Sequence, residues 1–183
     1  MTATLIGGAV ALLMSGACVG LGATLLARLG ALGGMGEGER LGMSFALGFG
    51  ALGWIVFFLA VPGLFHPWLL GALLAASLAG LATLRRDAAT PRAPYEALDA
   101  IGWSLVAGLA ATLLGDLLEG MSPPADADTL AYHFALPKQF IGAGRLEFVP
   151  RAVDGAVPLL PHMTYTMALA LGGERAMTLW TMK

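Results

Sequence analysis

Long apolar segments, separated by short polar connections, make up most of the first 118 residues. Four of them are about twenty residues long and carry almost no charge; they run over residues 5–27, 41–64, 67–84 and 101–118. A helix of about 20 apolar residues crosses the roughly 30 Å hydrocarbon core of a bilayer. The pattern therefore predicts an all-α, polytopic membrane protein with four transmembrane helices.

The connections between these segments give further expectations. No Lys or Arg precedes the first segment, as one would in a secretory signal peptide, so we interpret it as a retained span. Pro62, Gly63 and Pro67 punctuate the second connection, which predicts a tight hairpin of two helices. Small residues also recur four apart within the spans, a spacing that lets helix backbones pack closely, and we expect them to pack within the bundle. These pairs are Gly16 with Gly20 and Ser44 with Gly48.

Composition agrees with a membrane protein and narrows the class. Hydrophobic residues make up 57% of the 183 residues and charged residues only 12%, whereas soluble domains have roughly 45–50% and about 25%. This excludes a disordered chain, and it gives no reason to expect a nucleic-acid partner. The single cysteine, Cys18, rules out an intramolecular disulfide.

Arginines in the short connections predict the orientation. Five lie in the first and third connections, while the N-terminal tail and the second connection have no Lys or Arg. They are Arg28, Arg40, Arg85, Arg86 and Arg92. Basic residues of short loops favour the cytoplasmic side. We therefore expect the N-terminus and residues 119–175 to be extracytoplasmic, in a membrane such as the bacterial inner or plasma membrane.

The polar residues of the second half gather in this outer segment, so the sequence predicts three parts: a four-span bundle (1–118), an extracytoplasmic loop (119–175) and the start of a further span (176–183). Within the loop, we expect a short interfacial helix capped by Asp126 or Asp128. Its apolar stripe would be Leu130, Phe134, Pro137 and Ile141, and Gly142 and Gly144 would end it. Residues 158–171 predict a second interfacial helix or a re-entrant piece, and residues 172–175 predict a turn.

A series of residues in this loop carries a resemblance to a known group of enzymes. An acidic residue is followed by a Tyr four positions on, a Gly, a Val-Pro-Arg turn, a Pro that opens a second helix, and an Arg-Ala pair. These are Asp128, Tyr132, Gly144, Val149-Pro150-Arg151, Pro161 and Arg175-Ala176. In this order the loop resembles the first extracytoplasmic loop of GT-C glycosyltransferases that use polyprenyl-phosphate sugars, among them protein O-mannosyltransferases and lipid A aminoarabinose transferases.

The resemblance implies an inverting transferase that moves a sugar from a polyprenyl-phosphate donor to a lipid, glycan or protein acceptor. It implies that Asp128 is the general base, and Asp126 is the alternative candidate for the same role. Arg151, Lys138 and Arg145 would hold the carrier phosphate, and Tyr132 and His133 would line the acceptor site. Leu160 departs from the pattern, because aminoarabinose transferases have a phosphate-binding Lys at this position. Since members of the group are several hundred residues long, we expect this chain to be an N-terminal portion that is inactive alone.

Simpler interpretations stand beside each assignment. Asp128 is also a plain helix cap, worth about 1 kcal/mol, and the basic residues also suit anionic lipid headgroups. We expect no cofactor; a divalent metal held by His133, His162 and nearby acids is the alternative. The rival function is a non-catalytic membrane scaffold or accessory subunit. A transporter is less favoured, because no charged residue lies deep within a predicted span.

Overall fold

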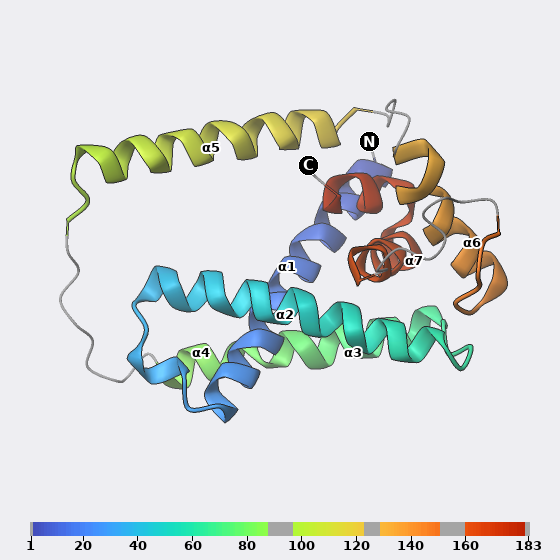
Figure 1. Cartoon of the computed structure of the whole chain (residues 1–183), viewed down its shortest axis with the longest axis horizontal. Helices are drawn as coiled ribbons and strands as arrows, with labels where there is room; N and C mark the ends of the chain where they lie inside the picture. Colours follow the sequence, from blue (N-terminus) through green and yellow to red (C-terminus); the bar gives the residue numbers. More distant parts are fainter. Residues whose placement is uncertain (1, 88–96, 123–128, 151–159, 182–183) are drawn as a thin grey trace.

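The computed structural model describes residues 2–87, 97–122, 129–150 and 160–181, and their regular structure is entirely helical (Figure 1). Four helical stretches are long and apolar enough to cross a membrane. They are α1 (Thr2–Arg28), α2 (Glu37–Ala60), α3 (Pro67–Ala79) continued by α4 (Leu81–Asp87), and α5 (Ala100–Gly120). The four stretches match the four apolar segments, so the predicted all-α class with four candidate spans is confirmed.

Glycines bring α1 into backbone contact with its neighbours. A Cβ on Gly22 would meet the backbone carbonyl of Ser44 in α2, and one on Gly48 would meet that of Cys18 in α1. On another face of α1, Gly20 and Gly80 approach in the same way, at the junction of α3 and α4. The small residues predicted to pack within the bundle therefore do so, because only glycine leaves room for these crossings.

Local signals set the helix ends. The helix α2 stops at Ala60, four residues before the end of the apolar segment, because Pro62 follows and Gly63 has a φ of 81°. The next helix, α3, begins with Pro67 in its first turn, where a missing N–H costs nothing. The start of α5 is capped by Asp99, whose Oδ1 accepts from the backbone N–H of Gly102 at 2.7 Å.

The helix α5 buries almost none of its surface within the chain. In Figure 1 it runs apart from α1, α2 and α3, and large apolar side chains such as Ile101, Leu105 and Leu109 are more than 60% exposed. A helix that is apolar on all sides suits a hydrocarbon environment rather than water. Near its end, the Nη1 of Arg175 donates to the backbone carbonyl of Met121 at 2.8 Å, which ties α5 to α7.

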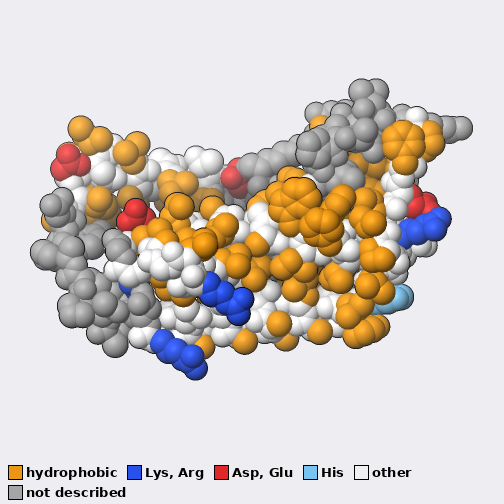
Figure 2. Space-filling view, turned by 60° about the horizontal axis from the view of Figure 1, so that its bottom comes forward, with side chains coloured by type: hydrophobic (Ala, Val, Ile, Leu, Met, Phe, Trp, Pro, Cys, Tyr) orange, Lys and Arg blue, Asp and Glu red, His pale blue; other side chains and the backbone are white. Residues whose placement is uncertain are grey.

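The helix directions give the molecule two distinct ends. The start of α1, the end of α2, the start of α3 and the end of α5 lie toward the right of Figure 1, together with α6 and α7; we call this the loop end. The opposite helix ends carry Arg28, Arg40, Arg85 and Arg86, and we call this the arginine end. Figure 2 shows a broad apolar surface between the ends, with most charged side chains toward them. This is the distribution expected of a membrane-embedded bundle.

The predicted single interfacial helix is instead two pieces. A π-helical turn (Thr129–His133) precedes α6 (Ala135–Ala143), and Gly144, with a φ of 67°, ends α6 as predicted. The predicted apolar stripe is correct at two of its four positions. Phe134 and Pro137 are buried, but Leu130 is 55% exposed and Ile141 is only half-buried. Leu136 and Phe140 complete the buried face instead. A π turn holds more residues than an α turn, so it rotates the chain after His133 out of the α-helical phase assumed for the whole segment.

The helix α7 (Leu160–Trp180) is a hairpin of two short helical arms. Gly173, with φ 73° and ψ −171°, breaks it within the predicted turn at 172–175, in a backbone region that is open almost only to glycine. The Nε1 of Trp180 donates to the Oγ1 of Thr164 at 2.9 Å, whereas residues 16 apart in a straight helix are about 24 Å apart. The helix α7 packs with α1 and α2, and Met163 and Met167 of its first arm are fully buried. The first arm is therefore part of the packed core, and its place relative to a membrane stays a prediction.

Candidate functional site

Three contacts assemble the loop end around α6 and the α7 hairpin. The Nζ of Lys138 in α6 lies 2.7 Å from the Oε1 of Glu174 at the hairpin turn. After α6, the backbone N–H of Leu146 donates to the carbonyl of Ala60, the last residue of α2, at 3.0 Å. With the contact of Arg175 on α5, these bonds link the ends of two candidate spans to the segment that holds the predicted site residues.

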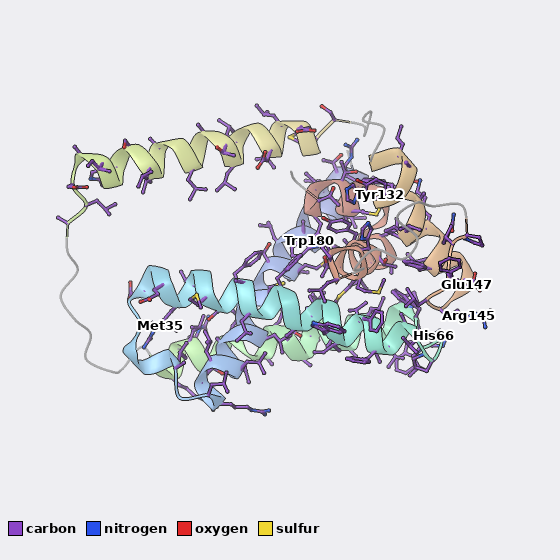
Figure 3. The ribbon with its side chains drawn as sticks, in the orientation of Figure 1. Met35, His66, Tyr132, Arg145, Glu147 and Trp180 are labelled. Atoms are coloured by element: carbon purple, nitrogen blue, oxygen red, sulfur yellow. The ribbon has the colours of Figure 1, made fainter. Side chains whose placement is uncertain are left out.

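Two histidines and two tyrosines from different parts of the chain meet at this end. The Nδ1 of His133 lies 3.2 Å from the Nε2 of His162, and the two rings are almost parallel, with centroids 5.1 Å apart. Tyr132 packs on His133 at 4.2 Å between ring centroids, and Tyr165 lies 5.6 Å from His162 and 6.1 Å from His133. We call these four residues the histidine–tyrosine cluster (Figure 3 labels Tyr132).

Local structure fixes both sides of the cluster. Tyr132 and His133 end the π-helical turn, and the buried Phe134 after them anchors this turn to the core. His162 and Tyr165 are three residues apart in the first arm of α7, so their side chains share one helix face. His162 is 4% exposed, whereas Tyr132, His133 and Tyr165 are half-buried. The cluster therefore has a rigid buried side and a side that reaches the surface.

The cluster combines proton-carrying and metal-binding groups with aromatic faces. A hydrogen bond between two imidazoles needs a donor on one ring and a lone pair on the other, so at least one of the two is neutral. Neutral imidazole nitrogens accept protons and bind metals near physiological pH. Two tyrosines add apolar faces with polar hydroxyl groups, a combination suited to amphipathic ligands. The arrangement can bind a polar ligand at the edge of an apolar bundle.

The two described residues of the predicted phosphate-binding set, Lys138 and Arg145, are each paired with a glutamate. Lys138 is paired with Glu174, and both side chains are about half or more exposed. The Nε and Nη2 of Arg145 both donate to the Oε1 of Glu147, at 3.0 and 2.9 Å. Figure 3 shows Arg145 and Glu147 beside the α2–α3 turn near His66, well away from Tyr132. Each described cation of the predicted set thus already has an anionic neighbour.

The other predicted residues lie outside the part of the chain that the structure describes. Asp126 and Asp128, the predicted base and its reserve, precede the described π-helical turn, and Arg151 follows the described segment 129–150. Their roles stay predictions. Of the residues expected to line an acceptor site, Tyr132 and His133 are brought together with His162, as the metal alternative also requires for the two histidines.

Sequence reasoning missed two members of the assembled site. Tyr165 joins the cluster, and its position three residues after His162 was a signal that could have been used. Glu174 binds Lys138 across 36 residues, and the sequence holds no comparable signal for this pairing. Within the four described ranges, no group of three or more His, Cys, Asp or Glu side chains is arranged to hold a metal ion, so the imidazole pair is the candidate ligand set there.

A second polar feature lies at the arginine end. A groove of about 330 Å³ is lined by residues of the α1–α2 connection and of α4, including Gly30, Thr83 and Arg86. Beside it, the buried Arg40 donates its Nε to the carbonyl of Leu32 at 3.0 Å, which holds the connection in place. The groove is at the opposite end from the histidine–tyrosine cluster, so the two features are separate.

No protein-family model matches this chain, and neither a curated protein nor a solved structure does.

Proposed function

We propose that the protein is a GT-C-like membrane glycosyltransferase, which moves a sugar from a polyprenyl-phosphate donor to an acceptor hydroxyl at the loop end. The observation that supports it is the histidine–tyrosine cluster. Tyr132 and His133, which the resemblance assigns to an acceptor site, lie in contact with each other and with two further polar aromatic residues, His162 and Tyr165. They do so where candidate spans end, which is where a lipid-linked substrate presents its headgroup.

In this proposal the loop end faces the extracytoplasmic side. The four described arginines of the short connections all lie at the other end, and basic residues in short loops favour the cytoplasm. The sugar of a membrane-anchored donor then lies at the level of the α7 hairpin, while the polyprenyl chain lies in the hydrocarbon. The exposed apolar surface of α5 is available to that chain or to other lipids.

The reaction would proceed with inversion at the anomeric carbon. The acceptor hydroxyl loses its proton to a carboxylate, its oxygen bonds to the anomeric carbon, and the bond from that carbon to the carrier phosphate oxygen breaks with its electron pair. Polyprenyl phosphate leaves. The resemblance assigns the carboxylate to Asp128, and a carboxylate near the apolar boundary is a stronger base than one in water.

A non-catalytic accessory subunit is the second candidate, and the ion pairs favour it. Lys138 and Arg145 are each matched by a glutamate, so at rest they attract a phosphate less than free cations would. Under this alternative the loop end is a docking surface and its acidic residues are structural.

The test is sugar transfer from a labelled polyprenyl-phosphate donor in membranes that contain the complete reading frame. A positioned general base contributes about 10²–10⁴-fold, so Asp128→Asn should reduce transfer at least about a hundredfold. Asp116→Asn is the matched control: it makes the same chemical change near the loop end of α5, at a residue with no proposed role, and should leave transfer unchanged. Transfer that survives Asp128→Asn but is lost in Asp126→Asn would move the base to Asp126. Transfer that survives both would refute the carboxylate assignment.

A further inference from the structure

The two histidines of the cluster direct ring nitrogens toward one another from distant parts of the chain. His133 belongs to the π-helical turn and His162 to the first arm of α7, and 29 residues separate them. We infer that these two imidazoles form a binding site for a divalent transition metal, with Zn²⁺ as the best match. This inference does not depend on sugar transfer, because it concerns the described residues alone.

The geometry fits a shared metal ion. Zinc lies about 2.0–2.1 Å from an imidazole nitrogen, and its preferred arrangement is tetrahedral. Two such nitrogens on one ion are therefore about 3.3 Å apart, close to the 3.2 Å between Nδ1 of His133 and Nε2 of His162. The rings are 17° from parallel with centroids 5.1 Å apart. A metal ion can replace the shared proton with little movement of either ring.

The surroundings hold both rings in place. His162 is 4% exposed and packed edge-on against Tyr165, and Thr166 donates its hydroxyl to the backbone carbonyl of His162 at 2.6 Å. His133 lies against Tyr132 and ends a π-helical turn. Such turns are rare and occur frequently at functional sites. Fixed rings lower the entropy cost of binding a metal.

The ligand chemistry selects the class of metal. Imidazole binds zinc, copper, iron and nickel, whereas calcium and magnesium require oxygen ligands. Cys18, the single thiol of the chain, is buried in α1, apart from the cluster residues in the π-helical turn and α7. The described residues offer two nitrogens, so a tetrahedral ion has further positions for other ligands, such as water or an oxygen of a phosphate; zinc sites that act on ligands also keep a position open.

The chain contains its own control, because it has three histidines. His66 precedes α3 at the α2–α3 turn, where its ring stacks on Trp68 with centroids 6.4 Å apart, and Figure 3 shows it well away from Tyr132. His66→Ala therefore removes an imidazole without touching the cluster.

The experiment is a titration of the purified protein, in detergent and with no polyhistidine tag, with Co²⁺ alone and then with Zn²⁺ as competitor. We expect one Co²⁺ per chain, with the visible absorption of a four-coordinate ion. Loss of supporting groups around a metal ligand costs about 10–100-fold in affinity, so His133→Ala and His162→Ala should each weaken binding at least about tenfold. His66→Ala should bind as the wild type does.

X-ray absorption at the zinc edge identifies the atoms bound to zinc in the wild-type protein. Because it needs no substitution, misfolding of a variant cannot affect the result. The inference predicts two imidazole ligands. Fewer than two, no binding of either metal, or binding that His133→Ala leaves unchanged would overturn it. If His162→Ala fails to fold, the half-exposed His133 still provides the substitution test.

Discussion

The indole Nε1 of Trp180 donates a 2.9 Å hydrogen bond to the hydroxyl of Thr164, in the opposite arm of α7. Thr164 is fully buried and its hydroxyl donates in turn to the carbonyl of Pro161 at 2.8 Å. Trp180 also packs on Phe49 of α2, with ring centroids 6.1 Å apart. One side chain thus closes the hairpin and ties it to the bundle, and the hairpin presents His162 to the cluster.

Replacing Trp180 by Phe tests this closure. The ring remains for Phe49, but the donor to Thr164 is lost, so we expect a loss of stability of about 0.5–1.5 kcal/mol. Trp103→Phe is the control, because Trp103 is 62% exposed on α5 and should change stability little. The measurement is reversible unfolding in detergent, followed by circular dichroism.

A double-mutant cycle with Thr164→Val isolates the bond itself. Residues in direct contact couple by about 0.5–3 kcal/mol, so the double variant should be less destabilised than the sum of the two single variants. Additive effects would show that Trp180 and Thr164 do not interact, and the proposed closure of the hairpin would be wrong.

The α1–α2 crossing makes a second prediction. Gly48→Ala places a Cβ against the backbone of Cys18 and forces the helices apart, whereas Gly50→Ala, two residues along α2, meets nothing within 4 Å. Overpacking of this kind costs about 1–3 kcal/mol. We therefore expect Gly48→Ala to unfold at lower denaturant concentration and Gly50→Ala to unfold like the wild type or later, since alanine favours the helix more than glycine does. Equal behaviour of the two variants would contradict the close crossing.

Accessibility of introduced cysteines tests the orientation. In a Cys18→Ser background, Gly36→Cys places a thiol in the α1–α2 connection, and Phe148→Cys places one at the loop end, where Phe148 is 71% exposed. A membrane-impermeant maleimide added to intact cells should label the thiol at position 148 and not the one at position 36. The reverse pattern would show that the arginine end is outside, against the charge bias of the loops.

The four candidate spans were predictable because the long apolar runs that form them are a local property of the sequence. The turn at Gly63 and the end of α6 at Gly144 were predictable for a related reason, since glycine and proline act on the backbone at their own positions. These features need no knowledge of distant contacts.

The rest depends on contacts between distant segments. Leu136 and Phe140 are buried because a π-helical turn precedes α6, and no residue pattern predicted this turn. The meeting of His133 with His162, and of Lys138 with Glu174, requires the α7 hairpin to fold back beside α6. A side chain that can pair with many partners meets one of them only when packing brings the two together. The sequence therefore suggested Tyr132, His133 and His162 as site residues, but neither Tyr165 nor the contacts among the four.

Release of polyprenyl phosphate tests the proposed transferase most directly. Membranes containing the complete reading frame are supplied with a polyprenyl-phosphate sugar, and both products are followed: the free carrier and the glycosylated acceptor. The account predicts that both appear together, in equal amounts, and that Asp128→Asn stops both while Asp116→Asn stops neither. Wild-type membranes that release no carrier above the level of membranes lacking the protein would contradict it and favour an accessory subunit.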